Sequence, residues 1–460
     1  MAFNQRMMYR AQEVIKEDIM GDYAENFKKL LSLLEEFCRV NCGSHQAFGL
    51  DSEGRYKRAF LSHPHISRHM ENGQRVLGID GSFMKHGSYR EVMLILVGRT
   101  GNNTNIVLAV ALCRSEDEDN CRWFLHQAKT AGVQFDGVPI FTDRGVGLLA
   151  AFERSQLGCI VRYCTRHIAG NIMKAFNGCV PIDLKGMVYR IQGADTDDEY
   201  KSHLAALSLT HASIANYLDA IPHEKWLMYP SSVSDIKMYG WRTTNFVESA
   251  NGAAIPARSM FPFHFFKDYM DKFMKQAYDI QKEGESWQQD GYKVTRYAEK
   301  MIKQEQTLAG TYSVHPSTSS VSYVRSTRTC PVQQRVDLDA KSCTCPYMRQ
   351  MGLPCRHYIA ALIEYKRIQE LYDACDPCYL VSNYLSGYGC GNSGIELALE
   401  ETIEARSVLP PLRTHNHVGR KKTKRIRSHQ QLPTAHSTVK ARKCTLCGDV
   451  GHNKRSCTTH

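Results

Sequence analysis

The stretch Val76-Leu-Gly-Ile-Asp-Gly-Ser-Phe83 decides the fold class, together with two apolar stretches that follow it. These are Val92-Met-Leu-Ile-Leu-Val97 and Asn105-Ile-Val-Leu-Ala-Val-Ala-Leu-Cys113. All three are short and rich in β-branched and aliphatic residues, and Gly and Asn residues typical of turns lie between them. The pattern predicts three consecutive strands that form a meander.

Alternating helix and strand patterns follow the meander. An acidic stretch at 116–119 leads into a helix that carries Trp123, and strands are expected at 139–143 and 159–164, with a helix at about 146–154 between them. The order βββαβαβ is that of a ribonuclease-H-like fold, an α/β fold with helices on both faces of a mixed sheet. Amphipathic helical segments between about 168 and 240 predict a helical insertion before the last helix of that fold.

Three carboxylates stand where such a fold can assemble a metal site. Asp80 ends the first strand, Asp143 ends the first strand after the meander, and Glu248 follows helix N-cap residues beyond the insertion. The first and fourth strands are neighbours in a ribonuclease-H-like sheet, so the two aspartates are expected to face one another. Two divalent metals about 4 Å apart, held by carboxylates, can drive phosphodiester cleavage and joining. Each acid alone reads more readily as a turn former or helix cap, but their order together favours a catalytic site for Mg²⁺ or Mn²⁺.

Four sequence blocks carry a resemblance to a known family. The blocks are Gly78-Ile-Asp-Gly-Ser-Phe83, Thr142-Asp-Arg-Gly-Val-Gly-Leu148, Cys164-Thr-Arg-His-Ile-Ala-Gly-Asn171 and Thr244-Asn-Phe-Val-Glu-Ser-Ala-Asn251. In order and approximate spacing they are similar to the characteristic blocks of Mutator-like (MULE) transposases, over about residues 5–362. The resemblance implies that Asp80, Asp143 and Glu248 form a DDE triad that binds Mg²⁺.

The family's Cys-x-x-His motif corresponds to Cys164 and His167. A structural pair at the end of a strand and a direct role near DNA both stay open, and the two residues are left out of the catalytic set because two ligands do not close a metal site. Full-length family members carry an N-terminal DNA-binding domain of the zinc-finger type. This chain is expected to begin almost directly at the helices that follow such a domain. Either the SWIM module and the tail recognise the element's ends, or the element is truncated, or the gene model is short.

A zinc-binding pattern follows the expected catalytic domain. Cys343 and Cys345 are separated by nine residues from Cys355, which is followed by His357. Three thiolates and one imidazole at this spacing predict a tetrahedral structural zinc site. The order strand, thiolate pair, loop, Cys/His pair and helix, together with Gly352-Leu-Pro-Cys-Arg-His357, resembles the SWIM zinc finger that follows the catalytic domain in MULE transposases.

All of the excess positive charge lies near the end of the chain. The formal net charge is +11, and residues 413–460 hold twelve Lys and Arg residues against one acid, Asp449. The basic residues expected to contact nucleic acid are Arg420, Lys421, Lys422, Lys424, Arg425 and Arg427. They can neutralise phosphates, and the segment resembles a minor-groove AT-hook only loosely. A nuclear import signal is at least as well supported.

A second structural zinc site is expected in the same tail. Its ligands are Cys444, Cys447, His452 and Cys457, which have zinc-knuckle spacing. So short a motif folds only around its metal. Thr445 and Asn453 stand where a base-stacking aromatic side chain is usual, so contact with nucleic acid and contact with protein both stay open.

Six segments are expected from these patterns. They are an N-terminal helical region at 1–75, a catalytic domain at 76–310 with its insertion at about 168–240, a SWIM zinc finger at 325–365, a connecting region at 366–412, a basic disordered tail at 413–443 and a zinc knuckle at 444–457. The chain has 460 residues, of which 43% are hydrophobic, as in ordinary globular proteins. At least six of its 17 cysteines occur in metal spacings, and no signal peptide is apparent, which favours a reducing compartment. No apolar run is long enough to span a membrane.

Three functions are compatible with these features. The first is a nuclear DDE transposase that cleaves its terminal inverted repeats and joins them to target DNA, as a homo-oligomer in a synaptic complex. The second is a domesticated derivative that binds DNA as a transcription regulator without cutting it. The third is an adaptor whose zinc sites are the function. The three acids favour the first, because a pure binder does not need a like-charged cluster.

Overall fold

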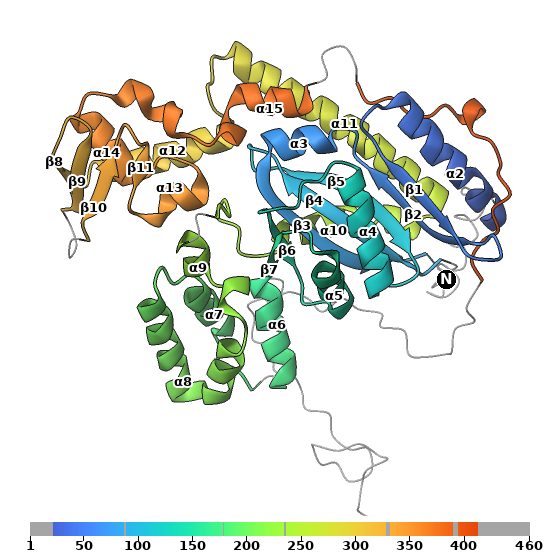
Figure 1. Ribbon diagram of the computed structural model, residues 1–460, viewed down its shortest axis with the longest axis horizontal. Helices are drawn as coiled ribbons and strands as arrows, with labels where there is room; N and C mark the ends of the chain where they lie inside the picture. The colour runs from blue at the N-terminus through green and yellow to red at the C-terminus, as the bar shows by residue number, and fades with distance from the viewer. Residues whose placement is uncertain are drawn as a thin grey trace, which may run out of the picture. The chain divides into compact units, whose positions relative to one another are not determined.

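A mixed sheet of seven strands lies at the centre of the main body (Figure 1). Its strands are β1 (Gln46–Leu50), β2 (Tyr56–Ser62), β3 (Gln74–Phe83), β4 (Val92–Arg99), β5 (Asn105–Cys113), β6 (Pro139–Thr142) and β7 (Ile160–Tyr163). They lie in the order β1-β2-β5-β4-β3-β6-β7. β3 pairs with β6, and β6 with β7, in parallel, whereas the other neighbours are antiparallel.

The computed structural model describes residues 22–86, 89–177, 179–233, 236–327, 332–389 and 394–412. The meander and the two later strands form where the sequence predicts them. Residues 46–62 differ from the expected helical region, because they form β1 and β2, and β2 pairs with β5 of the main sheet. These strands contain Gly49, Lys57 and Arg58, which interrupt an apolar alternation, so the pattern alone did not reveal them.

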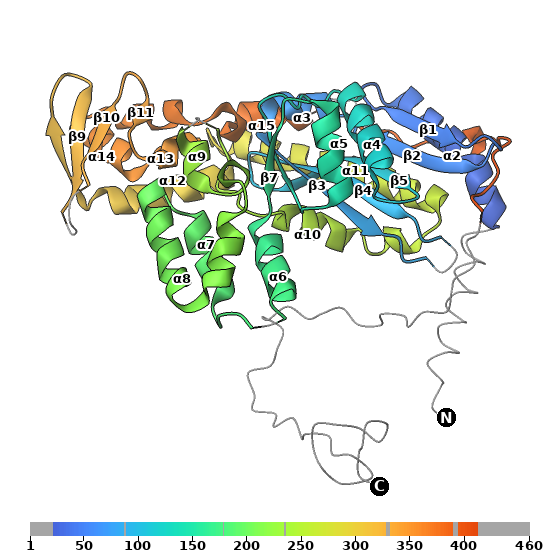
Figure 2. The ribbon, with the colours of Figure 1, turned by 60° about the horizontal axis from the view of Figure 1, so that its bottom comes forward.

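Helices cover both faces of the sheet (Figure 2). On one face, α4 (Glu118–Thr130) and α5 (Val146–Ser155) share a buried apolar core with Leu77 and Ile79. On the other face, α10 (Asn245–Ala253), α11 (Pro262–Gln289) and α2 (Tyr23–Val40) share a core with Val76. Alternate residues of a strand point to opposite faces, so the even-numbered positions of β3 around Asp80 face α10.

The remaining helices of the main body belong to an insertion and to short connections. They are α3 (Ile66–Asn72), α6 (Thr165–Ala175), α7 (Leu184–Gln192), α8 (Asp197–Asp219), η1 (His223–Lys225), α9 (Met228–Val233) and η2 (Ala257–Ser259). Helices α6, α7 and α8 bury an apolar core of their own, together with Trp226 and Leu227, which follow η1. Helices α6 to α9 lie between β7 and α10, over the range where the sequence predicts amphipathic helices.

A second, four-stranded sheet carries the zinc-binding pattern. It has the order β11-β10-β9-β8. The elements of this region are α12 (Arg296–Ala309), β8 (Tyr312–Pro316), β9 (Val321–Ser326), β10 (Gln334–Asp337), β11 (Ser342–Cys343), α13 (Pro346–Met351) and α14 (Arg356–Glu364). Sequence predicted the strand at β10 and the helix at α14, but not β8 and β9, whose Ser, His and Pro residues hide the strand pattern.

The connecting region returns to the main body. Its elements are η3 (Ile368–Ala374), η4 (Pro377–Tyr379), α15 (Val381–Tyr388) and η5 (Glu400–Thr402). Helix α15 packs on α11 and α3. Cys375 and Cys378 are free thiols.

Several sequence predictions fall outside the described residues. They include the basic segment from Arg420 to Arg427 and the zinc-knuckle residues Cys444, Cys447, His452 and Cys457. Among the helices that the structure describes, none is long and apolar enough to cross a lipid bilayer.

Candidate functional site

The three predicted acids come from two strands and one helix that are neighbours in the fold. Asp80 lies in β3, Asp143 directly follows β6, and Glu248 lies in the first turn of α10. Strands β3 and β6 are parallel neighbours, so their carboxyl ends meet at one edge of the sheet. A β-carbon at Gly78 would lie 2.1 Å from Cγ2 of Val247, so the glycine lets α10 approach β3 closely.

Asp80 lies near enough to the other acids for their charges to act on it. Burial, together with the negative charges of Asp143, Glu116 and Glu248, raises the pKa of Asp80 to about 7, and the charge of His167 acts in the opposite direction. Nδ2 of Asn251, one turn after Glu248, donates a hydrogen bond of 2.6 Å to Oδ2 of Asp80. Like charges that share a site make ionisation of each other costly, so this cluster favours a bound cation.

Glu116 is a fourth carboxylate that the sequence reasoning did not assign to the site. A β-carbon at Gly81 would lie 2.4 Å from Oε2 of Glu116, and one at Gly145 would lie 2.9 Å from Oδ1 of Asp143 and 3.4 Å from Oε1 of Glu116. Two glycines therefore leave the space that two carboxylates fill. Burial and the charge of Asp143 raise the pKa of Glu116 to about 6.

The position of Glu116 could have been found from strand direction. β5 is antiparallel to β4, which is antiparallel to β3. The carboxyl ends of β3 and β5 therefore point the same way, and Glu116 follows β5 by three residues. An acid just after the third strand belongs to the same sheet edge as Asp80.

Glu248 also contacts two basic side chains from α6. Nη1 of Arg166 forms an ion pair with Oε2 of Glu248, and Nε2 of His167 lies 3.7 Å from Oε1. Sequence reasoning did not assign Arg166. Its charge partly neutralises the acid cluster and holds Glu248 at the site.

Cys164 and His167 lie beside Glu248. Their ligand atoms and a carboxylate oxygen of Glu248 all lie within 4.8 Å of one another, which makes a possible second metal-binding group. A hydrogen bond with Cys164 raises the pKa of His167 to about 9, and the charges of Glu248 and Asp80 act in the same direction. Burial by itself would raise the pKa of Cys164, but its hydrogen bond with His167 lowers it.

The described carboxylates at the sheet edge have the chemistry that a hard divalent cation requires, although no three of them bring their oxygens within 4.8 Å of one another in this structure. Carboxylate oxygens are the ligands that Mg²⁺ and Mn²⁺ prefer, and Asp80, Asp143, Glu116 and Glu248 supply them. Among the described residues, no hydrogen bond or ion pair is seen for Glu116, although it is half-buried. A cation between Asp80, Asp143 and Glu116 would relieve the repulsion that raises the pKa of two of them.

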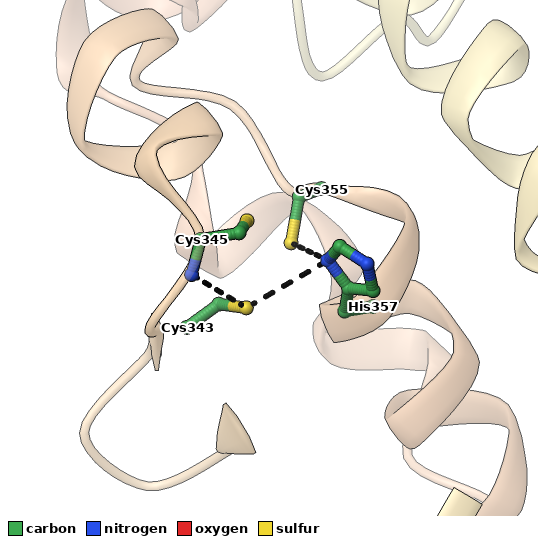
Figure 3. Close-up of side chains that lie close together, drawn as sticks. All are labelled: Cys343, Cys345, Cys355 and His357. Atoms are coloured by element: carbon green, nitrogen blue, oxygen red, sulfur yellow. Dashed lines mark hydrogen bonds between the residues drawn. The ribbon is translucent and has the colours of Figure 1, made fainter. Parts of the chain in front are cut away.

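The predicted zinc ligands form a compact cluster in the second sheet region (Figure 3). Cys343 ends β11, Cys345 precedes α13, and Cys355 and His357 flank the start of α14. Nδ1 of His357 lies 3.9 Å from Sγ of Cys343 and 3.8 Å from Sγ of Cys355. The three cysteines are buried. Hydrogen bonds from the other two thiols lower the pKa of Cys345, so one thiolate is already favoured.

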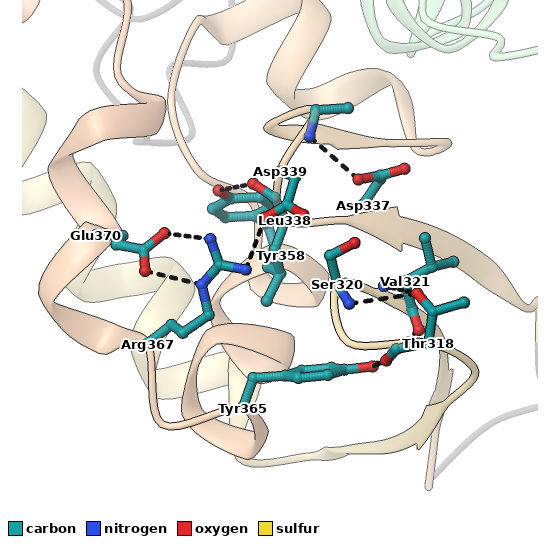
Figure 4. Close-up of polar contacts among 11 residues, drawn as sticks. Thr318, Ser320, Val321, Asp337, Leu338, Asp339, Tyr358, Tyr365, Arg367 and Glu370 are labelled. Atoms are coloured by element: carbon teal, nitrogen blue, oxygen red, sulfur yellow. Dashed lines mark hydrogen bonds and ion pairs between the residues drawn. The ribbon is translucent and has the colours of Figure 1, made fainter.

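Polar contacts hold α14 against the second sheet (Figure 4). Arg367 forms ion pairs with Asp339, at 2.8 Å, and with Glu370, at 2.7 Å. The hydroxyl of Tyr358 donates to the carbonyl of Leu338, at 3.3 Å. These contacts join the helix that carries Cys355 and His357 to the strand and turn that precede Cys343, and so bring the two ligand pairs together.

The comparison with protein families matches this module. The SWIM zinc finger family model matches residues 335–366. These residues are therefore a SWIM zinc finger with a buried Cys₃His zinc site, as the spacing predicted. A search of curated proteins found no match to the chain.

Proposed function

We propose that this protein is a DDE-type DNA transposase of the Mutator-like class, which cleaves the ends of its element and joins them to target DNA. The observation that carries the proposal is the gathering of Asp80, Asp143, Glu116 and Glu248 at one sheet edge, where their charges raise the pKa of Asp80. This cluster supports metal-dependent phosphodiester chemistry more directly than any other feature of the described chain.

The topology supports a ribonuclease-H-like core. Five neighbouring strands lie in the order β5-β4-β3-β6-β7, and the first three form an antiparallel meander. A DDE site in such a core takes acids from the first strand, the fourth strand and a later helix. Asp80, Asp143 and Glu248 hold those positions here.

The residues of the cluster have separable tasks in this reaction. A pair of bound Mg²⁺ or Mn²⁺ ions supplies activation of a water or 3′-hydroxyl and neutralises charge on the leaving oxygen. Asp80, Asp143, Glu116 and Glu248 are the acids that would hold these ions. Asn251 orients the carboxylate of Asp80 by its hydrogen bond, and Arg166 does the same for Glu248.

The other modules are assigned to DNA binding and assembly. SWIM zinc fingers are often found in transposase-derived proteins, and the finger follows the core in this chain. The basic segment around Arg420 and the second zinc motif around Cys444 are proposed to contact terminal inverted repeats and target DNA. The reaction joins two ends, so we propose a homo-oligomer that acts in the nucleus.

One observation favours a second function, a transcription regulator that binds DNA without cutting it. Glu248 is already paired with Arg166, and Asp80 with Asn251. These contacts lessen the need for metal and would suit an inactive descendant. The regulator differs from the transposase in one measurable respect, because it binds DNA without metal-dependent cleavage.

A nicking assay tests the proposal. Purified full-length protein is incubated with duplex DNA that carries the inverted repeats flanking its own gene, with Mg²⁺ or Mn²⁺. The transposase predicts cleavage at the repeat boundary and, with a supercoiled target, joined products. Intact DNA at every metal concentration, with the DNA still bound, would support the regulator instead.

A further inference from the structure

The Cys-x-x-His pair lies where the chain returns from the helical insertion. Cys164 is the N-cap residue of α6, which begins the insertion, and Arg242 to Thr244 lead from it into α10. Oγ1 of Thr165 donates to the carbonyl of Arg242 at 3.0 Å, and Nε2 of Gln192 donates to the same carbonyl at 3.2 Å. The two ends of the insertion are therefore tied together beside the acid cluster.

Thr244 is held from two sides at the start of α10. Its backbone N–H donates to Sγ of Cys164 at 3.3 Å, and its hydroxyl lies 3.5 Å from Nδ1 of His167. Thr244 is the N-cap residue of α10, but its side chain makes no capping hydrogen bond to that helix. Oγ1 of Thr243 accepts the N–H of Asn245 at 3.3 Å instead. The backbone and the hydroxyl of Thr244 are thus left to contact the sulfur of Cys164 and the imidazole of His167. The other ring nitrogen of His167 faces Glu248, at 3.7 Å.

The place of Glu248 depends on where α10 begins. Paired strands fix the positions of Asp80 and Asp143, whereas Glu248 follows the helical insertion, which lies outside the sheet. A helix rises 1.5 Å per residue, so a slip of one residue at Thr244 would carry the carboxylate out of reach of a shared cation. Misplacement of about 1 Å can cost on the order of 100-fold in rate at a catalytic site.

We propose that Cys164 and His167 are positioning residues, which clamp Thr244 so that Glu248 faces Asp80 and Asp143. This inference rests on the proposed function of the acid cluster. It gives the Cys-x-x-His motif a role that needs neither contact with DNA nor a metal of its own.

The alternative of a zinc ion held by Cys164, His167 and Glu248 fits the contacts less well. Cys164 already accepts the N–H of Thr244, and Glu248 already pairs with Arg166. A hydrogen-bonded clamp satisfies each of these groups without an ion. The two roles differ in zinc content, which the test below measures.

The test compares Cys164→Ala, Cys164→Ser and His167→Ala in the full-length protein. The matched control is Cys159→Ser. Cys159 is a half-buried free thiol directly before β7, the strand that Cys164 follows. Mn²⁺ affinity is measured by calorimetry, KM for duplex DNA by cleavage kinetics, and zinc per chain by atomic emission. Thermal unfolding shows whether each variant folds. The side chain of His167 is 36% exposed, so His167→Ala is expected to fold even if Cys164→Ala does not.

The clamp predicts Mn²⁺ affinity about 10- to 100-fold weaker in Cys164→Ala and His167→Ala, as for other groups that orient metal ligands. KM for DNA and zinc content should stay at wild-type values. Cys164→Ser should recover most of the affinity, because its hydroxyl can accept the N–H of Thr244. Unchanged Mn²⁺ affinity in both alanine variants would overturn the clamp and leave the proposed function standing.

Two further results would also overturn the clamp. Loss of one zinc per chain in Cys164→Ala would assign the motif to a metal site. A wild-type protein that neither binds Mn²⁺ nor cleaves DNA would overturn the clamp and the proposed function together.

Discussion

Glu305 of α12 binds Arg356, the residue between the zinc ligands Cys355 and His357, through three hydrogen bonds. The carboxylate of Glu305 accepts from the backbone nitrogen, Nε and Nη2 of Arg356 at 2.9, 2.9 and 2.8 Å. The side chain of Glu305 is only 6% exposed. A helix outside the zinc cluster therefore fixes the orientation of the segment that carries two of its four ligands.

Replacement of Glu305 is expected to weaken zinc binding. Glu305→Gln should lower zinc affinity by about tenfold or more, because groups that orient metal ligands contribute that much. Glu305→Ala should also cost about 1–3 kcal/mol of stability, since it leaves the partly buried guanidinium without its acceptor. Competition with a chromophoric chelator measures the affinity. Glu364→Gln, on the exposed side of α14, is the control, and equal affinities in the two Gln variants would contradict the argument.

Loss of a zinc ligand should release one metal ion and loosen the SWIM finger. Cys355→Ser is expected to lose one zinc per chain, because a thiolate is a far better zinc ligand than a hydroxyl. Hydrogen exchange in α13 and α14 should rise, whereas exchange in the buried strand β4 should not. Cys375→Ser, at a half-buried thiol outside the ligand set, should keep its zinc. Full zinc content in Cys355→Ser would argue against the assigned site.

Glu116 is expected to contribute to metal binding at the sheet edge. Glu116→Gln should raise the Mn²⁺ concentration for half-maximal cleavage by about tenfold or more. It should also lower the pKa of Asp80, since one of the charges that raise it is removed. Gly81→Ala should have a similar effect on cleavage, because the new methyl group would collide with the Glu116 carboxylate.

The neighbouring Glu118→Gln provides the matched control for Glu116. Glu118 pairs with Arg154 at 2.9 Å and does not contribute to the pKa of Asp80. Its variant should cleave with the metal dependence of the wild type. Equal metal dependence for Glu116→Gln and the wild type would show that Glu116 does not contribute to metal binding.

Acid should destabilise the main body through three buried histidines. Burial lowers the pKa of His69 to about 3 and of His65 to about 4, and holds that of His63 well below its usual value. The unfolded chain binds protons at these sites below about pH 6.5, while the folded chain does not. The free energy of unfolding should therefore fall as pH drops from about 6.5 towards 4, by up to about 1.4 kcal/mol per pH unit for each histidine.

His69→Asn isolates one of these contributions from the acid lability of the zinc site. Nδ1 of His69 lies 2.5 Å from the hydroxyl of Tyr388, and an asparagine can keep a hydrogen bond to that hydroxyl without titrating. Urea unfolding at pH 7.5, 6.5 and 5.5 should show a shallower pH dependence in the variant. Parallel curves for the variant and the wild type would show that His69 is not neutral in the folded protein.

The strands of the meander could be predicted because they are continuous apolar runs bounded by turn residues. Strands β1, β2, β8 and β9 could not, because charged and turn-forming residues interrupt their patterns and their pairing is set by tertiary contacts. β2 contains Lys57 and Arg58, yet it pairs with β5 from Arg58 to its last residue, Ser62. Local pattern thus predicts the centre of a sheet better than its margins.

Some residues of the candidate site could likewise be predicted from local pattern, whereas others depend on tertiary contacts. Asp143 could be chosen from its place directly after a strand, and the Cys₃His cluster from its spacing alone. Asp80 was expected to end its strand, but β3 continues to Phe83, because Gly81 to Phe83 still pair with β4. Glu248 could be chosen from the N-cap residues that precede it beyond the insertion, and the family resemblance points to the same residue. To assign Glu116 to the site, one needs the directions of three strands. To assign Arg166, one needs to know that α6 lies beside α10, and no local sequence pattern encodes that contact.

The most direct test of the acid cluster is metal-dependent cleavage by Asp80→Asn beside Asp198→Asn. Asp198 is an exposed residue of the insertion, so its variant controls for the loss of one carboxylate. We expect wild-type protein and Asp198→Asn to nick DNA carrying the element's ends in Mg²⁺ or Mn²⁺, and Asp80→Asn to bind that DNA equally well without nicking it. Cleavage by Asp80→Asn at the wild-type rate would contradict the assignment of this cluster as the catalytic centre.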